Sequence, residues 1–219
     1  MDPFKRAEDL PRVIPVFPLD GALLLPHGSL PLHIFEPRYI DMVDAAMGGE
    51  RIIGMVQTLP GGDPARPELQ PVGCAGKITA FAETGDGRYL ITLTGLARFA
   101  TREELPVTTP FRQVRADFSA YGADLMPIED DDGFDRLRLL GALKGYLERR
   151  TLEVDWEAVK ATPAEALVSS LAMALPFEPA EKQALLEAAA GAERRRTLVA
   201  LMEIDAGARI EGDRPPSLQ

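Results

Sequence analysis

Short apolar runs, broken by proline and glycine, dominate the first third of the chain. Val13–Phe17, Ala22–Leu25 and Leu30–Phe35 are each too short for a typical helix and are flanked by turn residues. This pattern predicts buried strands rather than helices. Proline cannot donate to a sheet ladder, so the prolines of this block are expected at strand ends, edges or bulges. They are Pro15, Pro18, Pro26 and Pro31.

The pattern then changes to helical spacing and back again. Pro37 stands where a helix tolerates proline, at its first position, and Gly48 follows as a stop. Further strands are predicted at Arg51–Thr58, Gly73–Glu83, Arg88–Thr94, Ala97–Glu103 and Phe111–Phe118. Short strands at this spacing predict a closed or nearly closed sheet.

From Tyr121 onward the chain reads as helices. Asp132 is a predicted cap for a helix with leucines from Leu137 to Leu147 on one stripe. Thr162–Glu165 has the form of a capping box, and Pro179 is expected to begin another helix. A last helix is predicted at Glu193–Ile204, followed by a frayed tail, Arg209–Gln219. We therefore expect a β-rich lobe over residues 1–120 and a helical lobe over 121–219.

Composition narrows the classes of function. Hydrophobic residues make up 46% of the 219 residues, enough for a substantial core, and the net charge is -10. An acidic chain repels phosphate backbones, so binding to nucleic acid is not expected. With Cys74 as its one cysteine the chain cannot form an internal disulfide, which favours a reducing compartment. No apolar run suggests a signal peptide or a membrane span, so we expect a cytoplasmic protein.

Several motifs together resemble one known family, the N-terminal substrate-binding domain of Lon proteases. They cover most of residues 12–118, and the helical remainder fits the second lobe of such domains. The motifs are Ile14–Leu19, Leu25–Gly28, Leu30–Tyr39, Arg51–Val56, Val72–Ile78 and Leu93–Phe99. The resemblance implies an α+β fold, in which a mostly antiparallel pseudo-barrel of the PUA-like kind precedes the helical lobe.

The modules that make Lon an enzyme are not found in this sequence. A phosphate-binding loop is missing, because the Gly76-Lys77 pair is followed by Ile78 in a strand-like run. No serine stands in a nucleophile-elbow context. His27, His33 and Cys74 lack the spacing of metal ligands. We therefore expect the recognition domain in a standalone form, with no catalytic residue, metal or cofactor.

Candidate binding residues come from two places in the helical part. Leu175, Pro176 and Phe177 join two helices and form either a buried plug or the apolar lip of a peptide groove. Trp156 could pack between the lobes or anchor a partner. A second set belongs to the family motif, and we expect a structural role for it. It comprises Pro18, Pro26, Phe35, Glu36, Arg38 and Tyr39.

The function predicted from these observations is noncatalytic binding of unfolded or apolar peptide segments, or of a protease or other protein partner. A cleft between the lobes is the expected place, and an adaptor or regulator in proteolysis or protein quality control is the expected role. The alternatives are RNA binding by a PUA-like barrel and regulatory protein–protein binding without substrate delivery, since a related domain occurs in cereblon. The sequence leaves the oligomeric state open.

Overall fold

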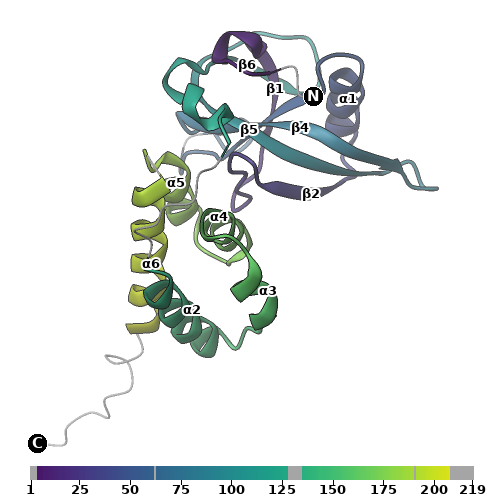
Figure 1. Ribbon diagram of the computed structural model, residues 1–219. Coiled ribbons are helices and arrows are strands. Elements are labelled where there is room, and N and C mark those ends of the chain that lie inside the picture. The colour runs from purple at the N-terminus through teal and green to yellow at the C-terminus, as the bar shows by residue number, and fades with distance from the viewer. Residues whose placement is uncertain (1–3, 62, 128–134, 190, 208–219) are drawn as a thin grey trace, which may run out of the picture. The chain divides into compact units, whose positions relative to one another are not determined.

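The computed structural model describes residues 4–61, 63–127, 135–189 and 191–207 (Figure 1). The sheet has six strands: β1 (Val13–Pro18), β2 (Ser29–Ile34), β3 (Ile52–Val56), β4 (Val72–Glu83), β5 (Tyr89–Glu104) and β6 (Arg112–Asp117). The helices are α1 (Pro37–Met47), α2 (Arg136–Arg150), α3 (Trp156–Ala161), α4 (Ala164–Ala174), α5 (Pro179–Glu187) and α6 (Gly191–Gly207). Two short 3₁₀ helices, η1 (Ala7–Asp9) and η2 (Ser119–Leu125), complete the described elements. The predicted α+β class is confirmed.

The strands close into a ring through β5. The sheet order is β2-β5-β4-β3-β1-β6, and the far end of β5 also pairs with β6. With 16 residues, β5 is long enough to pair with β2 near its start and with β6 near its end. The β1–β3 pair is parallel, whereas the other named pairs are antiparallel. β2 lies outside the ring, so the barrel is a partial one.

The Phe99 side chain lies inside the closed ring of strands and is fully buried. Two glycines make the space for its side chain. A Cβ built on Gly54 would stand 2.9 Å from the Phe99 ring, and one on Gly73 would stand 2.6 Å from it. The Phe118 ring packs at 6.0 Å from the Phe99 ring. The glycines of the Lon-like motifs therefore act in packing, because any larger residue would collide with this core.

The strand predicted at Ala22–Leu25 is absent, although its leucines are buried. The Ala22–Leu25 segment packs against the sheet instead of forming a strand in it. Leu24 packs over Gly76, and the Leu25 carbonyl would lie 2.0 Å from a Cβ on Gly95. The apolar run is thus buried because Gly76 and Gly95 leave space for it, and it does not form the strand that the pattern predicted. The runs predicted at Arg88–Thr94 and Ala97–Glu103 also differ, because they form the single strand β5.

The described residues divide into two compact units, and the division does not follow the sequence order. The first unit takes in residues up to Pro127 together with Met173–Glu187, and the second takes in the rest. The sequence assigned residues 121–219 to one helical lobe, but α5 packs with the β-rich unit. The predicted frayed tail, Arg209–Gln219, lies outside the described residues.

Buried polar side chains hold α5 in the first unit. Gln57 donates to the Pro179 carbonyl and to Gln183 Oε1, both at 3.0 Å, and Gln183 donates to the Val72 carbonyl at 3.1 Å. Lys182 Nζ donates to a backbone carbonyl of the loop after β1 at 2.6 Å, and its burial lowers the pKa of the ammonium. These bonds join residues more than 100 positions apart in the chain, so local sequence patterns could not reveal them.

The second unit contains α2, α3, most of α4, and α6. Asp135 caps α2, since its carboxylate accepts from the Arg138 N–H at 3.0 Å; the predicted cap, Asp132, lies outside the described residues. Glu165, predicted to close a capping box, is instead buried beside Arg195 as an ion pair. Leu137 was placed on the apolar stripe of α2 but is 83% exposed. The buried stripe starts at Leu139, two positions later.

Candidate functional site

Most of the family-motif residues have structural positions. Pro26 is buried, and Pro18 is half-buried at the end of β1. Tyr39 on α1 is buried with its ring centroid 4.1 Å from that of Phe17. These contacts fix the start of α1 against β1. The structural role that the sequence suggested for these residues stays a prediction.

Glu36 and Arg38 pair with each other at the start of α1. Their charged atoms are 2.8 Å apart, and both side chains are about half exposed. Arg38 also lies over the Tyr39 ring, 4.6 Å from its centroid. Glu36 occupies the N-cap position without a side-chain capping bond, so its contact with the helix end is at most electrostatic. An exposed pair of this kind contributes about 0–1 kcal/mol to stability.

Phe35, for which we expected a structural role, is not a core residue. It follows the last residue of β2 and is 62% exposed. Its ring stands edge-on to the His33 ring, with 5.9 Å between the centroids. The alternation of β2 explains the difference: Ile34 points inward and is buried, so its neighbour Phe35 points outward. A large aromatic ring of the motif therefore faces solvent.

Phe35 belongs to an exposed region built by β2, β5 and β4. The register aligns Pro31, Thr92 and Ala80 in one row across the three strands. His33, Leu90 and Ala82 form the next row. Because residues two apart share a face of a strand, the six side chains lie on one face of the sheet. We call these six residues and Phe35 the uncharged face.

The uncharged face is mostly apolar, with Thr92 and His33 as its polar members, in a chain that is otherwise rich in charge. Residues 29–35, 79–82 and 89–94 contain no Asp, Glu, Lys or Arg, although 26% of the whole chain is charged. Leu90 is 49% exposed, and Pro31, His33, Ala80 and Ala82 are exposed as well. Phe35 and Leu90 are its two large exposed apolar side chains, and a contiguous exposed apolar patch is typical of interaction sites.

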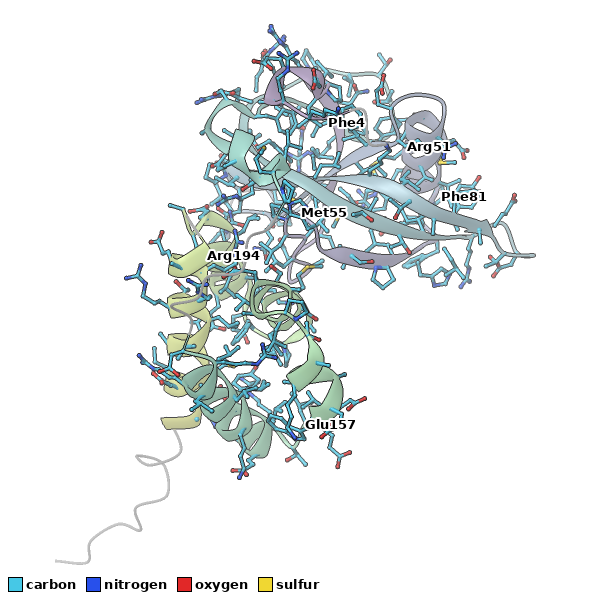
Figure 2. The ribbon with its side chains drawn as sticks, viewed as in Figure 1. Phe4, Arg51, Met55, Phe81, Glu157 and Arg194 are labelled. Carbon is cyan, nitrogen blue, oxygen red and sulfur yellow. The ribbon has the colours of Figure 1, made fainter. Side chains whose placement is uncertain are left out.

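A shallow hollow of about 500 Å³ lies over this part of the sheet. Its lining residues are Pro31, Leu32, His33, Ala80, Phe81, Ala82, Leu90, Ile91 and Thr92. Figure 1 shows the outer halves of β4 and β5 running out beyond the other strands with β2 beside them, and Figure 2 labels Phe81 on this hairpin. The two alanines leave room that larger side chains would fill. The hollow can therefore take apolar side chains of an extended segment.

The opposite face of the hairpin carries an aromatic pair and has acidic neighbours. Phe81 and Tyr89 pack with their ring centroids 4.8 Å apart. The Tyr89 hydroxyl donates to Asp44 of α1 at 3.0 Å. This hydrogen bond is the main cause that raises the pKa of Tyr89, and the nearby charges of Asp44, Glu83 and Asp41 add to it. Through the Tyr89 hydroxyl, the aromatic pair links the hairpin to α1.

The residues predicted for peptide binding lie elsewhere. Leu175 and Phe177 are buried in the first unit, at 5% and 6% exposure, while Pro176 between them is exposed. Phe177 thus fits the buried-plug alternative better than the apolar lip. Trp156 is half-buried at the start of α3 in the second unit. The structure does not gather these four residues within one unit, and the uncharged face contains none of them.

The uncharged face is not evident in the sequence because its residues are spread over three strands. The available signal was the lack of charge in three separate strand segments, which acquires meaning only once the strands are known to be neighbours. Among the described residues, no group of three His, Cys, Asp or Glu side chains gathers in a way that could hold a metal ion. In the same part of the chain, none of the helices is long and apolar enough to cross a membrane.

Comparisons with known proteins agree with the fold. The crystal structure of a Lon N-terminal domain protein from Xanthomonas campestris matches 86% of this chain and 97% of its own, with a TM-score of 0.59 and 23% identity. The N-terminal domain of the Mycobacterium avium complex Lon protease matches 87% of this chain and 98% of its own, with the same TM-score and 18% identity. At these identities the likeness supports the fold alone.

Sequence relatives point to the same family. Lon protease 2 of Myxococcus xanthus is 30% identical over 112 residues, which are 50% of this chain and 13% of that protein. The Lon protease of Roseiflexus castenholzii is 26% identical over 204 residues, which are 92% of this chain and 25% of that protein. The chain thus spans a quarter or less of the length of these two relatives. The family model for the ATP-dependent protease La (LON) substrate-binding domain matches residues 13–203, which confirms the resemblance found in the motifs, and the chain belongs to this family.

Proposed function

We propose that this chain is a substrate-recognition module that binds extended, apolar polypeptide segments on its uncharged face. The observation that carries the proposal is the face itself. Phe35 and Leu90 are exposed beside a hollow of about 500 Å³, and no charged residue interrupts the three strand segments that form it. Membership of a substrate-binding domain family supports the same conclusion.

The chemistry of the face selects for unfolded apolar segments. Burial of exposed apolar side chains is favourable by roughly 25 cal/mol per Å², without a need for specific polar partners. A charged client side chain would lose water at this face and gain no counter-charge. Ordering a flexible segment offsets much of the contact energy, so we expect about 4–8 kcal/mol of net binding, or millimolar to micromolar affinity.

The proposed role is that of a noncatalytic adaptor or regulator in proteolysis. A module that only binds clients can hold them for a protease or can compete with it for them. A degradation assay with a full-length Lon-type protease and an unfolded client separates the two cases. An adaptor speeds loss of the client, whereas a competitor slows it in proportion to the amount of module added.

The binding proposal is tested by NMR titration of the labelled chain with an unfolded apolar peptide. We expect shifts in the outer halves of β2, β4 and β5. Leu90→Glu should weaken binding at least about tenfold, because it places an unpaired charge at the contact. Leu137→Glu is the matched control, since Leu137 is an exposed leucine on α2 of the second unit.

Each outcome of this titration has a clear meaning. Equal weakening by Leu90→Glu and Leu137→Glu, with both variants folded, would show that binding does not use the uncharged face. No shift anywhere at millimolar peptide would exclude the proposed function. Stoichiometric binding of one folded protein, or salt-sensitive retention of RNA, would then favour the regulatory or the RNA-binding alternative.

A further inference from the structure

The outermost strand of the sheet borders the uncharged face. β2 pairs with β5 on one side, and among the described residues no strand pairs with its other side. Its alternate residues Ser29, Pro31 and His33 are exposed. A strand edge of this kind presents backbone N–H and C=O groups to solvent and can pair with another extended chain.

The pairing with β5 fixes which backbone groups point outward. The Gly95 N–H donates to the Gly28 carbonyl at 2.9 Å, so residue 28 is a hydrogen-bonded partner of β5. Backbone groups of an antiparallel strand alternate in direction. The even-numbered residues of β2 therefore bond to β5, and the groups of Ser29, Pro31 and His33 point to the open edge.

We propose that the client binds as an additional strand along the outer edge of β2, with alternate side chains lying over the uncharged face. This inference rests on the proposed function and states how the same site holds its substrate. The edge offers the N–H groups of Ser29 and His33 and the carbonyls of Ser29, Pro31 and His33. A client strand therefore pairs through every second residue, whatever its sequence.

Pro31 gives this edge a preference for a client over a second copy of the chain. Proline has no N–H, so a client opposite Pro31 lacks one bond and still donates to the Pro31 carbonyl. In the antiparallel register that overlaps the three outward-facing residues of two β2 edges completely, Pro31 would face Pro31, and both bonds of that central pair would be missing. Edge prolines suppress self-pairing in this way. The edge thus stays open to foreign segments.

The test uses the unmodified protein and a set of peptides with one N-methylated residue each. N-methylation removes a single backbone donor and blocks the edge at that residue. We expect affinity to fall about fivefold or more at every second residue and to change little at the residues between. Loss of about fivefold corresponds to ~1 kcal/mol, the usual net size of one backbone hydrogen bond.

Two variants of Pro31 provide an independent measurement. Pro31→Val and Pro31→Ala both restore the missing N–H, but valine keeps an apolar branched side chain and alanine does not. We expect both variants to bind the client several-fold more tightly and to self-associate at high concentration by analytical ultracentrifugation. A gain with valine alone would assign the effect to the side chain and would count against strand addition.

The outcome for strand addition is distinguishable from the outcome for peptide binding itself. A peptide that binds the uncharged face with no alternation among its N-methylated forms would overturn strand addition and leave the proposed function intact. Absence of any binding by the unmethylated peptide would exclude both strand addition and the proposed function. Alternating losses together with the Pro31 gains would support the inference.

Discussion

Among the polar side chains of the first unit, Arg98 is the one whose replacement we expect to lower the free energy of unfolding most. It lies on β5 and is 5% exposed. Its guanidinium donates to both carboxylate oxygens of Asp124 at 2.8 Å and to the Leu186 carbonyl of α5 at 3.2 Å. It also stacks 4.9 Å from the centroid of the Tyr121 ring. Replacement therefore affects the η2 segment and α5 together.

Arg98→Met keeps an unbranched apolar stem and removes the charged guanidinium. The Asp124 carboxylate, 10% exposed, would then stay buried without its cation. Loss of one partner from a buried ion pair costs about 3–5 kcal/mol, so we expect the free energy of unfolding to fall by that amount. Urea denaturation gives the value, and hydrogen exchange should show faster opening of the α5 amides.

The control and the double variant make this reasoning refutable. Arg38→Met breaks an exposed pair in the same unit and should cost less than about 1 kcal/mol. Arg98→Met combined with Asp124→Leu should recover part of the loss, because no charge then remains buried. Equal costs for Arg98→Met and Arg38→Met, or strictly additive single losses in the double variant, would refute the buried-pair argument.

Two further predictions concern the motif phenylalanine and the hairpin. Phe35→Ala should change the free energy of unfolding by less than about 0.5 kcal/mol because Phe35 is 62% exposed, whereas Phe99→Ala should lower it by ~3–5 kcal/mol because Phe99 is fully buried. Urea unfolding of the two variants measures both changes, and a large loss for Phe35→Ala would contradict its exposure. The carboxylate of Asp44 accepts from the Tyr89 hydroxyl and so raises the pKa of Tyr89 above the ordinary value of 10.0. Asp44→Asn should lower that pKa in an ultraviolet titration. The stabilisation that the bond contributes is present below pH 10 and is lost as the pH rises through the raised pKa. An unchanged pKa of Tyr89 in Asp44→Asn would contradict the contact.

The strands and α1 were predictable because their signals are local. Proline and glycine mark the ends of β1 and β2, and Pro37 and Gly48 bound α1 within one residue. Signals failed where burial came from distant partners. Ala22–Leu25 has the composition of a strand, but the space over two glycines decided its conformation. The assignment of α5 to the β-rich unit depends on side-chain bonds from Gln57 and Arg98, which no spacing in the sequence encodes.

The sequence suggested binding residues near Phe177 rather than the exposed apolar surface, for a related reason. Aromatic residues next to proline suggested a rigid apolar lip at Phe177, yet that ring is buried. Hydrophobicity along a sequence predicts which residues avoid water, but it does not identify the exposed exceptions. An exposed apolar surface is recognised only after the strands are placed side by side. Here the register between β2, β5 and β4 supplied the information that the sequence lacked.

Phe35 changes what the family motif means. A residue that the fold needs should be buried, as Tyr39 is, four positions further along the same motif. Phe35 is exposed beside His33 and continues the line of the uncharged face. The fold gains little from an aromatic ring in that position, and exposed apolar area lowers solubility. A cost of this kind is best explained by contact with another chain, so the motif that identified the fold also contains part of the proposed binding surface.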